Sequence, residues 1–241
     1  MLKYFSIFFL CIFTTALVLA QPAKQAPLYF KRGVQLQEKG LLPDAIASFK
    51  KAIFLNKKYD SAYLALGMLY TKVNKVDSAI ITLNNALQIK PGFVNAYIML
   101  GNIYRDNLGK PDEAIINYLN AIKTDSNNKV TYYSLAWCYN AKENYREAIK
   151  YGVKALDIDN DYKPAYNELG HAYHLIKAYQ EGIDQFKKNL AISVNDLPML
   201  YSGYCYMEMN QKEDALKMYE ELKKINPKMA EALKKNLDLM K

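Results

Sequence analysis

Residues 60–93 read DSAYLALGMLYTKVNKVDSAIITLNNALQIKPGF, and this stretch decides the fold. Tyr63 and Gly67 are four residues apart, and a tyrosine follows three residues later, which places all three on one stripe of an α-helix. After a polar turn, Ala79 and Leu83 mark a second helix with the same spacing. The stretch therefore predicts two amphipathic helices joined as a hairpin.

The same pattern recurs along the chain at intervals of 34, 34, 35, 34 and 33 residues. The bulky residue that opens the pattern is found at Tyr29, Tyr63, Tyr97, Tyr132, Tyr166 and Met199. The small residue four positions later is Gly33, Gly67, Gly101, Ala136, Gly170 and Gly203. The second helix repeats a small residue at Ala45, Ala79, Ala114, Ala148, Gly182 and Ala215. A period of this length predicts a repeat protein whose hairpins bury their apolar faces against one another.

The combined pattern of an aromatic residue, Leu, Gly and Tyr, then Ala, an aromatic residue, Ala and Pro, resembles the tetratricopeptide repeat (TPR) family. The resemblance implies an all-α fold, a right-handed α-α superhelix of about six hairpins plus a C-terminal capping helix. The repeats are expected near residues 26–59, 60–93, 94–128, 129–162, 163–195 and 196–228, after a short linker at 21–25, with the cap at 229–241.

Several residues depart from this pattern. The extra residue of the third repeat is expected in the turn at Leu108–Pro111, and Gly152 and Asn189 predict looser packing in the fourth and fifth repeats. Arg32 replaces an expected leucine, which suits an uncovered N-terminal surface. The apolar side of the cap is expected to consist of Met229, Ala232, Leu233, Leu237 and Met240.

The first twenty residues belong to a different class. Lys3 precedes an almost uninterrupted apolar run that ends at Ala20, a pattern typical of a signal peptide cleaved after that residue. We therefore expect an exported protein, periplasmic or secreted, and an uncleaved membrane anchor is the alternative. Cleavage would remove one lysine and lower the formal net charge from +8 to +7.

Cys138 and Cys205 occupy equivalent positions two repeats apart. Packed helices are spaced by about 8 to 10 Å, whereas a disulfide needs Cα atoms within about 7 Å. Both cysteines are therefore expected to be free, small apolar residues of the core.

In the TPR family the first helices line a concave groove, and the resemblance implies which side chains would face a ligand here. In the first repeats these are mostly aliphatic, such as Leu64 and Met68. The predicted peptide-binding residues are Asn102, Arg105, Tyr133, Trp137, Asn140, Asn167, His171, His174 and Tyr204. Trp137, the single tryptophan, is either the anchor of a bound peptide or a filler between adjacent helices.

Other chemistries find little support in the sequence. No phosphate-binding glycine loop, nucleophile motif or paired His/Cys metal motif occurs, so neither an enzyme nor a cofactor is expected. His171, His174 and Glu168 share a helical face and could in principle bind a metal, but hydrogen-bonding imidazoles are the favoured interpretation. The Lys–Asn pairing typical of TPR domains that bind acidic C-termini is missing, because Ile98 stands beside Asn102.

The sequence thus predicts an exported scaffold or adaptor that binds a protein or an extended peptide in its groove, and no nucleic acid. The alternative is a protein that attaches to an anionic membrane or envelope polymer through exposed lysine pairs, for example Lys50 with Lys51 and Lys223 with Lys224. Salt would weaken the second mode more than the first. Stacking of this kind is also compatible with a homodimer.

Overall fold

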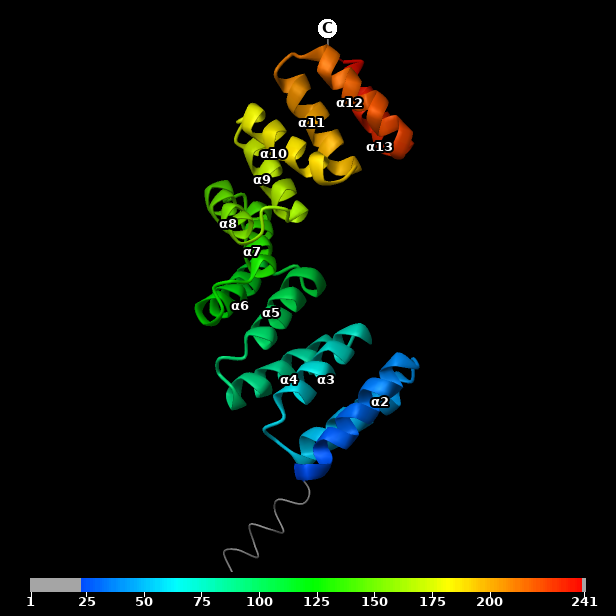
Figure 1. Cartoon of the computed structure of the whole chain (residues 1–241), viewed down its shortest axis with the longest axis vertical. Coiled ribbons are helices and arrows are strands. Elements are labelled where there is room, and N and C mark those ends of the chain that lie inside the picture. Colours follow the sequence, from blue (N-terminus) through cyan, green and yellow to red (C-terminus); the bar gives the residue numbers. More distant parts are fainter. Residues whose placement is uncertain (1–22, 240–241) are drawn as a thin grey trace, which may run out of the picture. The chain divides into compact units, whose positions relative to one another are not determined.

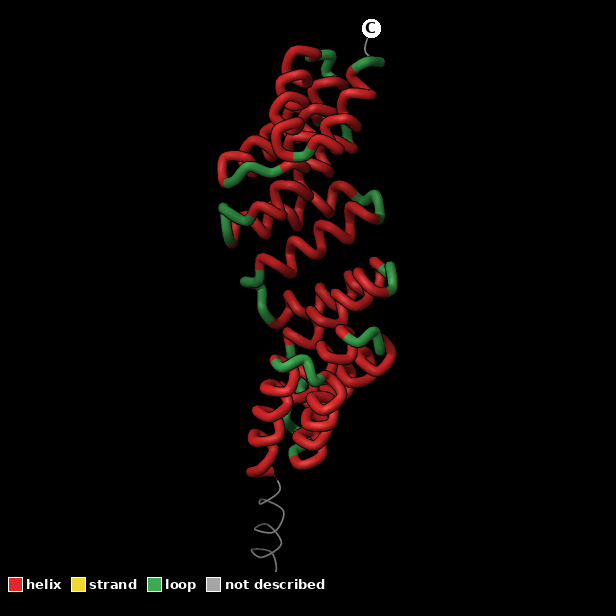
Figure 2. The backbone as a smooth tube through the Cα atoms, turned by 90° about the vertical axis from the view of Figure 1, so that its right-hand side faces the viewer, coloured by secondary structure: helices red, strands yellow, loops and turns green. Residues whose placement is uncertain are grey.

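A computed structural model describes residues 23–239 of the chain. This part consists of helices and short turns and has no strand (Figures 1 and 2). It divides into two compact units, the first ending at Asn107 and the second beginning at Leu108. The predicted leader at residues 1–20 lies outside the described residues.

The first unit begins with a helix over residues 23–38. It continues with α2 (Leu42–Leu55), α3 (Asp60–Lys72), α4 (Val76–Ile89), α5 (Val94–Asn102) and the π-helix η1 (Ile103–Asn107). The second unit contains α6 (Pro111–Thr124), α7 (Lys129–Ala141), α8 (Tyr145–Ile158), α9 (Lys163–Leu175), α10 (Tyr179–Ile192), α11 (Asp196–Glu208), α12 (Lys212–Ile225) and α13 (Pro227–Leu237). Within each unit consecutive helices pack against each other as hairpins, which confirms the predicted all-α hairpin architecture.

Small residues on the first helix of a hairpin allow the second helix to approach closely. A Cβ atom added at Gly67 would lie 2.8 Å from the Leu83 side chain, and one at Gly170 would lie 2.4 Å from the ring of Phe186. Real Cβ atoms essentially never come this close to a neighbour. Gly67 and Gly170 are therefore required by packing, as the spacing of the repeat predicts.

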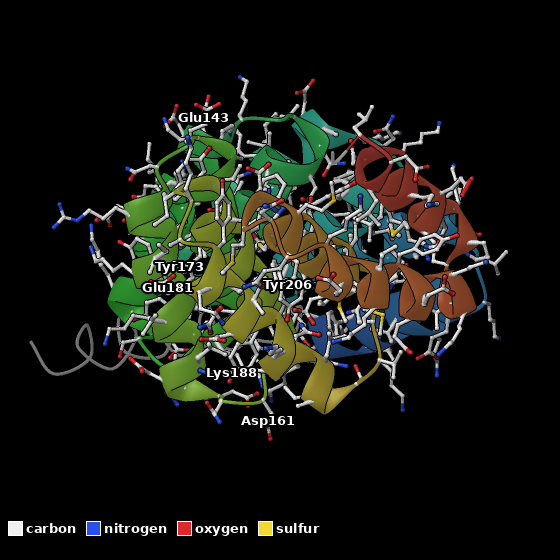
Figure 3. The ribbon with its side chains drawn as sticks, turned by 90° about the horizontal axis from the view of Figure 1, so that it is seen from above. Glu143, Asp161, Tyr173, Glu181, Lys188 and Tyr206 are labelled. Carbon is white, nitrogen blue, oxygen red and sulfur yellow. The ribbon has the colours of Figure 1, made fainter. Side chains whose placement is uncertain are left out.

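The turn inside each hairpin uses one residue with left-handed backbone, namely Gly40, Asn74, Gly109, Glu143, Lys177 and Asn210. In the second hairpin the next backbone N–H, from Lys75, donates to the Tyr70 carbonyl at 2.8 Å, and Ala178 repeats this bond to Tyr173 at 2.9 Å. Such bonds satisfy carbonyl groups that the helix end would leave unpaired. Glu143, seen at the margin of the ribbon in Figure 3, has φ of 58°, a conformation in which a side chain is strained.

The extra residue of the third repeat is not in the turn, and that prediction is wrong. The helix that begins at Val94 continues as the π-helix η1, whose wider coil takes up one additional residue. Gly109 then has the left-handed conformation with φ of 62° that Asn74 and Lys177 have in their turns. The insertion is therefore absorbed inside the helix, and the turn keeps its form.

The predicted loosening of the fourth and fifth repeats is also wrong. In the fourth repeat a Cβ atom at Gly152 would lie 2.8 Å from Leu169 of the next hairpin, so no space is left beside it. The neighbouring Tyr151 stacks on Tyr139 with ring centroids 5.4 Å apart. In the fifth repeat Asn189 is fully buried and hydrogen-bonded. The space is therefore filled by the aromatic side chain of Tyr151 in the fourth repeat and by the buried amide of Asn189 in the fifth.

The C-terminal helix α13 covers the last hairpin, although its details differ from the prediction. It begins at Pro227, two residues earlier than expected, and it buries Ala230, Leu233 and Leu237 while Ala232 is exposed. Leu233 contacts the last hairpin so closely that a Cβ atom at Gly203 would lie 2.6 Å from it. Ala230, Leu233 and Leu237 are spaced by three and four residues and so form one stripe of the helix, and Ala232 lies outside that stripe.

Cys138 and Cys205 are free and buried, as predicted. Burial raises the pKa of the Cys205 thiol to about 12, so this thiol is protonated at neutral pH. A protonated, buried thiol is a poor nucleophile. Both cysteines act as small core residues.

Polar pairs close the open end of several hairpins by joining the first residue of one helix to the residue that ends the next. Lys90 Nζ lies 2.8 Å from Asp60 Oδ2, and Lys163 Nζ lies 2.9 Å from Ser193 Oγ. Lys129 and Asp159 form the same contact in the fourth repeat. The hydrogen bond from Lys90 lowers the pKa of Asp60. Because these pairs are exposed and screened by water and salt, each stabilises the hairpin only weakly.

Candidate functional site

The second unit contains a cleft of about 600 Å³. It is lined mainly by α7, α9 and α11, the first helices of three successive hairpins. Its lining residues are Tyr133, Trp137, Asn140, Ala141, Lys163, Pro164, Asn167, Glu168, His171, Phe186, Asn195, Leu197 and Tyr201. One lining residue comes from α10, and Asn195 immediately precedes α11.

Five of the nine predicted binding residues lie in this cleft, namely Tyr133, Trp137, Asn140, Asn167 and His171. Trp137 keeps 37% of its surface exposed. These positions come from two different helices, α7 and α9, so the fold brings together residues that are far apart in sequence. Their assignment to peptide binding stays a prediction.

The other four predicted residues lie elsewhere. The His174 ring lies beside Tyr201 at 6.2 Å, and Tyr204 lines a separate hollow next to α13. Asn102 and Arg105 belong to the first unit. Arg105 contacts Asp106 through two hydrogen bonds of 2.6 and 2.9 Å.

The π-helix also changes the register of Arg105. Because η1 adds one residue before the turn, counting back from Gly109 makes Asp106 the equivalent of Asn140 and His174. The sequence count assigned that position to Arg105. The bond pattern of the helix, which repeat counting does not reveal, accounts for the difference.

Asn140 connects two of the lining helices. Its Nδ2 atom donates to the Glu168 backbone carbonyl at 3.0 Å and to Glu168 Oε2 at 2.8 Å. The residue is 8% exposed, and its Oδ1 atom is buried with no hydrogen-bond partner among the described residues. An unpaired buried acceptor costs about 1 to 3 kcal/mol. Such an atom is expected to receive a donor from a bound molecule or an ordered water.

Asn189 orients a second cleft residue from behind. Its Nδ2 atom donates to the Lys163 backbone carbonyl at 2.8 Å and to Asn167 Oδ1 at 3.0 Å. Since the Asn167 oxygen accepts this bond, the amide nitrogen of Asn167 is the end directed away from Asn189. The cleft thus presents an oriented amide donor at Asn167 beside the carboxylate of Glu168.

Aromatic rings form one wall of the cleft around Tyr201. This ring stacks on Phe186 with centroids 5.9 Å apart and meets the edge of His171 at 5.3 Å. Burial raises the pKa of Tyr201, so its hydroxyl is a neutral donor at pH 7. Burial also lowers the pKa of His171, with a smaller contribution from His174. The wall is therefore uncharged at neutral pH.

Comparison with known proteins now settles the family. Two sequence profiles of the tetratricopeptide repeat match residues 60–93, 94–128, 130–162 and 199–228, which together are more than half of the chain. The chain belongs to the tetratricopeptide repeat family. The TPR hairpins predicted from the 34-residue period are thereby confirmed, and proteins of this family serve as scaffolds for protein interactions.

Solved TPR structures share the fold at low sequence identity. YrrB, described as a TPR protein with an unusual peptide-binding site, is 23% identical, with a TM-score of 0.68 over 78% of this chain and 97% of YrrB. PilW, described as a widely conserved type IV pilus biogenesis factor, is 17% identical, with a TM-score of 0.73 over 86% of this chain and 97% of PilW. At these identities the likeness shows the fold alone.

A curated relative matches a shorter stretch. The protein O-mannosyl-transferase Tmtc3 of Drosophila melanogaster is 28% identical over 111 residues, which are 46% of this chain. The chain spans 12% of the length of that protein.

Tyr201 and Glu168 are among the lining residues that the sequence analysis did not assign to the site. Tyr201 follows the fifth position of its helix, and Glu168, considered only as a metal ligand, follows the fifth position of its own. Both lie outside the four positions that the family assigns to its groove. The partners of Asn140 and Asn189 lie 28 and 22 to 26 residues away, so the sequence carried no local signal of these contacts.

The metal hypothesis gains no support from this TPR domain. Within residues 23–239 no group of three or more His, Cys, Asp and Glu side chains is arranged to hold a metal ion. His171 and His174 contact the Tyr201 ring instead. Over the same residues no helix has both the length and the apolar character that a membrane crossing requires.

Proposed function

We propose that this TPR protein is an exported adaptor that binds an extended segment of a partner protein in the cleft between α7, α9 and α11. The observation that carries the proposal is the lining of that cleft. It joins a partly exposed tryptophan to oriented amides and to a buried, unpaired acceptor at Asn140. Flat aromatic anchors combined with a few directed polar groups are typical of peptide recognition.

A binding role fits the chemistry of the cleft better than catalysis. The one imidazole that lines the cleft, His171, lies beside the Tyr201 ring, and no cysteine is among the lining residues that the structure describes. YrrB, which has a similar fold, is described as having a peptide-binding site. The partner chemistry of this chain still has to be tested on the chain itself.

Export is a separate part of the proposal and rests on residues 1–20. Their apolar run after Lys3 and the small residue at Ala20 favour a cleaved signal peptide. Mass spectrometry of the protein isolated from its own cells would give a chain beginning at Gln21. Recovery of the uncleaved chain from membranes would instead establish the anchored alternative.

Attachment through the basic exterior is less well supported. Many exposed lysines are paired along their own helix, such as Lys150 with Glu147, Lys217 with Asp214 and Lys224 with Glu221. In these pairs the amine already contacts a carboxylate, so it is less available for direct contact with a membrane or polymer. We therefore do not propose this mode as the function.

The experiment is site-specific photo-crosslinking in intact cells. A photoreactive amino acid replaces Trp137 in the cleft, and in a matched control it replaces Ile116, which is 60% exposed on α6 and does not line the cleft. We expect one partner to be captured from position 137 and not from position 116. Equal capture from both positions, or capture that disappears in moderate salt at both, would contradict binding in the cleft.

A further inference from the structure

We propose that the cleft selects a basic side chain of the partner, arginine above lysine, which lies between the aromatic rings with its charged end at Glu168 and Asn140. This inference rests on the proposed peptide-binding function and adds the chemistry of the ligand.

The first argument is the distribution of charge in the cleft. Among the lining residues, all of them in the described part of the chain, Glu168 is the one carboxylate and Lys163 the one amine. The Lys163 amine donates to Ser193 at 2.9 Å and so closes the end of its hairpin. Glu168 lies one helical turn further into α9 and is held by Asn140 from α7. The charged group beside Asn140 is therefore the carboxylate of Glu168, whereas the Lys163 amine is held at the end of its hairpin.

The second argument is the balance of donors and acceptors. The Nδ2 atom of Asn140 donates to the backbone carbonyl and to the carboxylate of Glu168, and the Oδ1 atom of Asn140 is buried without a donor. A carboxylate accepts about four hydrogen bonds, so Glu168 can hold Asn140 and a ligand cation at once. A guanidinium group brings five N–H donors in a planar fork, and this is the complement of two neighbouring acceptors.

The third argument is the character of the walls. Tyr133, Trp137 and Tyr201 line the cleft, and the faces of such rings attract cations, most strongly in the case of tryptophan. Guanidinium groups also stack on aromatic faces, which favours arginine over lysine. A ligand carboxylate would meet both the electron-rich ring faces and the negative charge of Glu168.

The charge of the whole chain refines the partner. The formal net charge is +8, so a strongly basic protein would be repelled at long range. The structure therefore favours a neutral or acidic segment that carries one basic residue at the point of contact. The positively charged chain would attract the acidic residues of the segment, and the cleft would select the segment through its single arginine.

The test begins with an unbiased library of random twelve-residue peptides selected against the whole chain and, in parallel, against Trp137→Ala. Peptides that bind the wild type and are lost with Trp137→Ala would support the proposed function, whatever their composition. We expect these peptides to carry one strongly enriched arginine or lysine. Selection of peptides that do not depend on Trp137, or of none, would overturn the proposed function and this inference with it.

The second step measures the charge directly. The single tryptophan lies in the cleft, so its fluorescence reports binding of the best selected peptide and of the same peptide with citrulline in place of arginine. Citrulline keeps the size of the side chain and removes the charge. We expect at least a tenfold loss of affinity for the citrulline peptide. We also expect Glu168→Gln to lower the affinity for the arginine peptide at least tenfold, so that the two peptides become nearly equal.

Matched controls separate the role of Glu168 from folding. Glu181→Gln removes an exposed carboxylate of α10 that does not line the cleft, and it should leave both affinities unchanged. Circular dichroism should show the same helicity for both variants, because glutamine retains an acceptor for Asn140. If Trp137-dependent peptides lack a basic residue, or if Glu168→Gln binds the arginine peptide as well as the wild type, the inference fails while the proposed function stands.

Discussion

The second hairpin, α3 with α4, and the fifth, α9 with α10, share a packing frame and differ in what they present. In both, a glycine of the first helix faces a large side chain of the second, Leu83 in one case and Phe186 in the other. This pair sets the separation of the two helices. Its recurrence explains why hairpins of different composition have the same backbone.

The inner faces of these two hairpins have different chemistry. The positions taken by Leu64 and Met68 in the second hairpin are Asn167 and His171 in the fifth. One buried position also changes, since Ala86 corresponds to Asn189, and both are fully buried. A few positions outside the pair of glycine and large residue therefore decide whether this surface is apolar or polar.

The strongest test of the shared frame is Gly170→Ala. The new methyl group would lie 2.4 Å from the buried Phe186 ring, so we expect the free energy of unfolding to fall by about 2 to 3 kcal/mol. Gly67→Ala meets the more flexible end of Leu83 at 2.8 Å, and its cost should be nearer to 1 kcal/mol. Urea unfolding followed by circular dichroism measures both. Equal costs would show that the ring does not set the helix separation.

Exchanging the buried residues tests the polar difference. Ala86→Asn would bury an amide at the position equivalent to Asn189, and Leu64, which takes the place of Asn167, has no side-chain acceptor for it, so we expect a loss of about 2 kcal/mol. Asn189→Ala should cost about 1 kcal/mol, because it removes two hydrogen bonds and also an unpaired oxygen. Thermal unfolding of the two variants gives the comparison. A neutral Ala86→Asn would contradict the account of how Asn189 is accommodated.

The turns of the two hairpins differ in strain. Asn74 and Lys177 both have left-handed backbone, with φ of 57° and 64°, and asparagine tolerates this conformation better than lysine. We expect Lys177→Gly to raise the free energy of unfolding by about 0.5 to 1 kcal/mol. Asn74→Gly should change it by only a few tenths. Denaturant midpoints would decide, and a destabilised Lys177→Gly would refute the strain.

Acid should affect the two hairpins in different pH ranges, with the smallest effects of the series. Burial lowers the folded-state pKa of His171 and His174, and Glu208 opposes part of the shift at His174. Their contribution is complete above the unfolded value of about 6.5 and is lost as pH falls through the folded values. The pKa of Asp60 is lowered by Lys90, so its contribution is lost only as pH falls below about 3.9.

Melting temperatures measured between pH 7.5 and pH 3 would separate these ranges. A variant with both histidines replaced by asparagine should lose the first decrease and keep the second. A first decrease that survives in this variant would assign it to other groups.

Much of the fold could be predicted because small and large residues alternate at fixed intervals in the sequence. The glycines at 67 and 170 and their large partners recur at fixed spacing, so the hairpins follow from packing alone. The same reasoning failed where the residue spacing alone did not show which helix type forms or which side of a helix is buried. The extra residue of the third repeat lies in a π-helix, and the buried stripe of α13 contains Ala230 in place of the predicted Ala232.

The candidate site was predictable only in part. Trp137 and Asn167 were found because they stand at positions that the TPR family uses for its groove. Glu168 and Asn189 were not assigned to the site, because their role depends on contacts between helices. Such contacts depend on how neighbouring hairpins meet, which a single sequence does not specify.

The π-helix has a consequence for how such a chain tolerates changes in length. A residue gained within α5 and η1 turns the following side chains around the helix axis by about one position, and the disturbance ends at the left-handed Gly109. In the hairpins that follow, the side chains again have the orientation that the repeat pattern predicts. Removing one residue between Ile103 and Asn107 should therefore yield an ordinary α-helix there, with the repeats on either side left as they are.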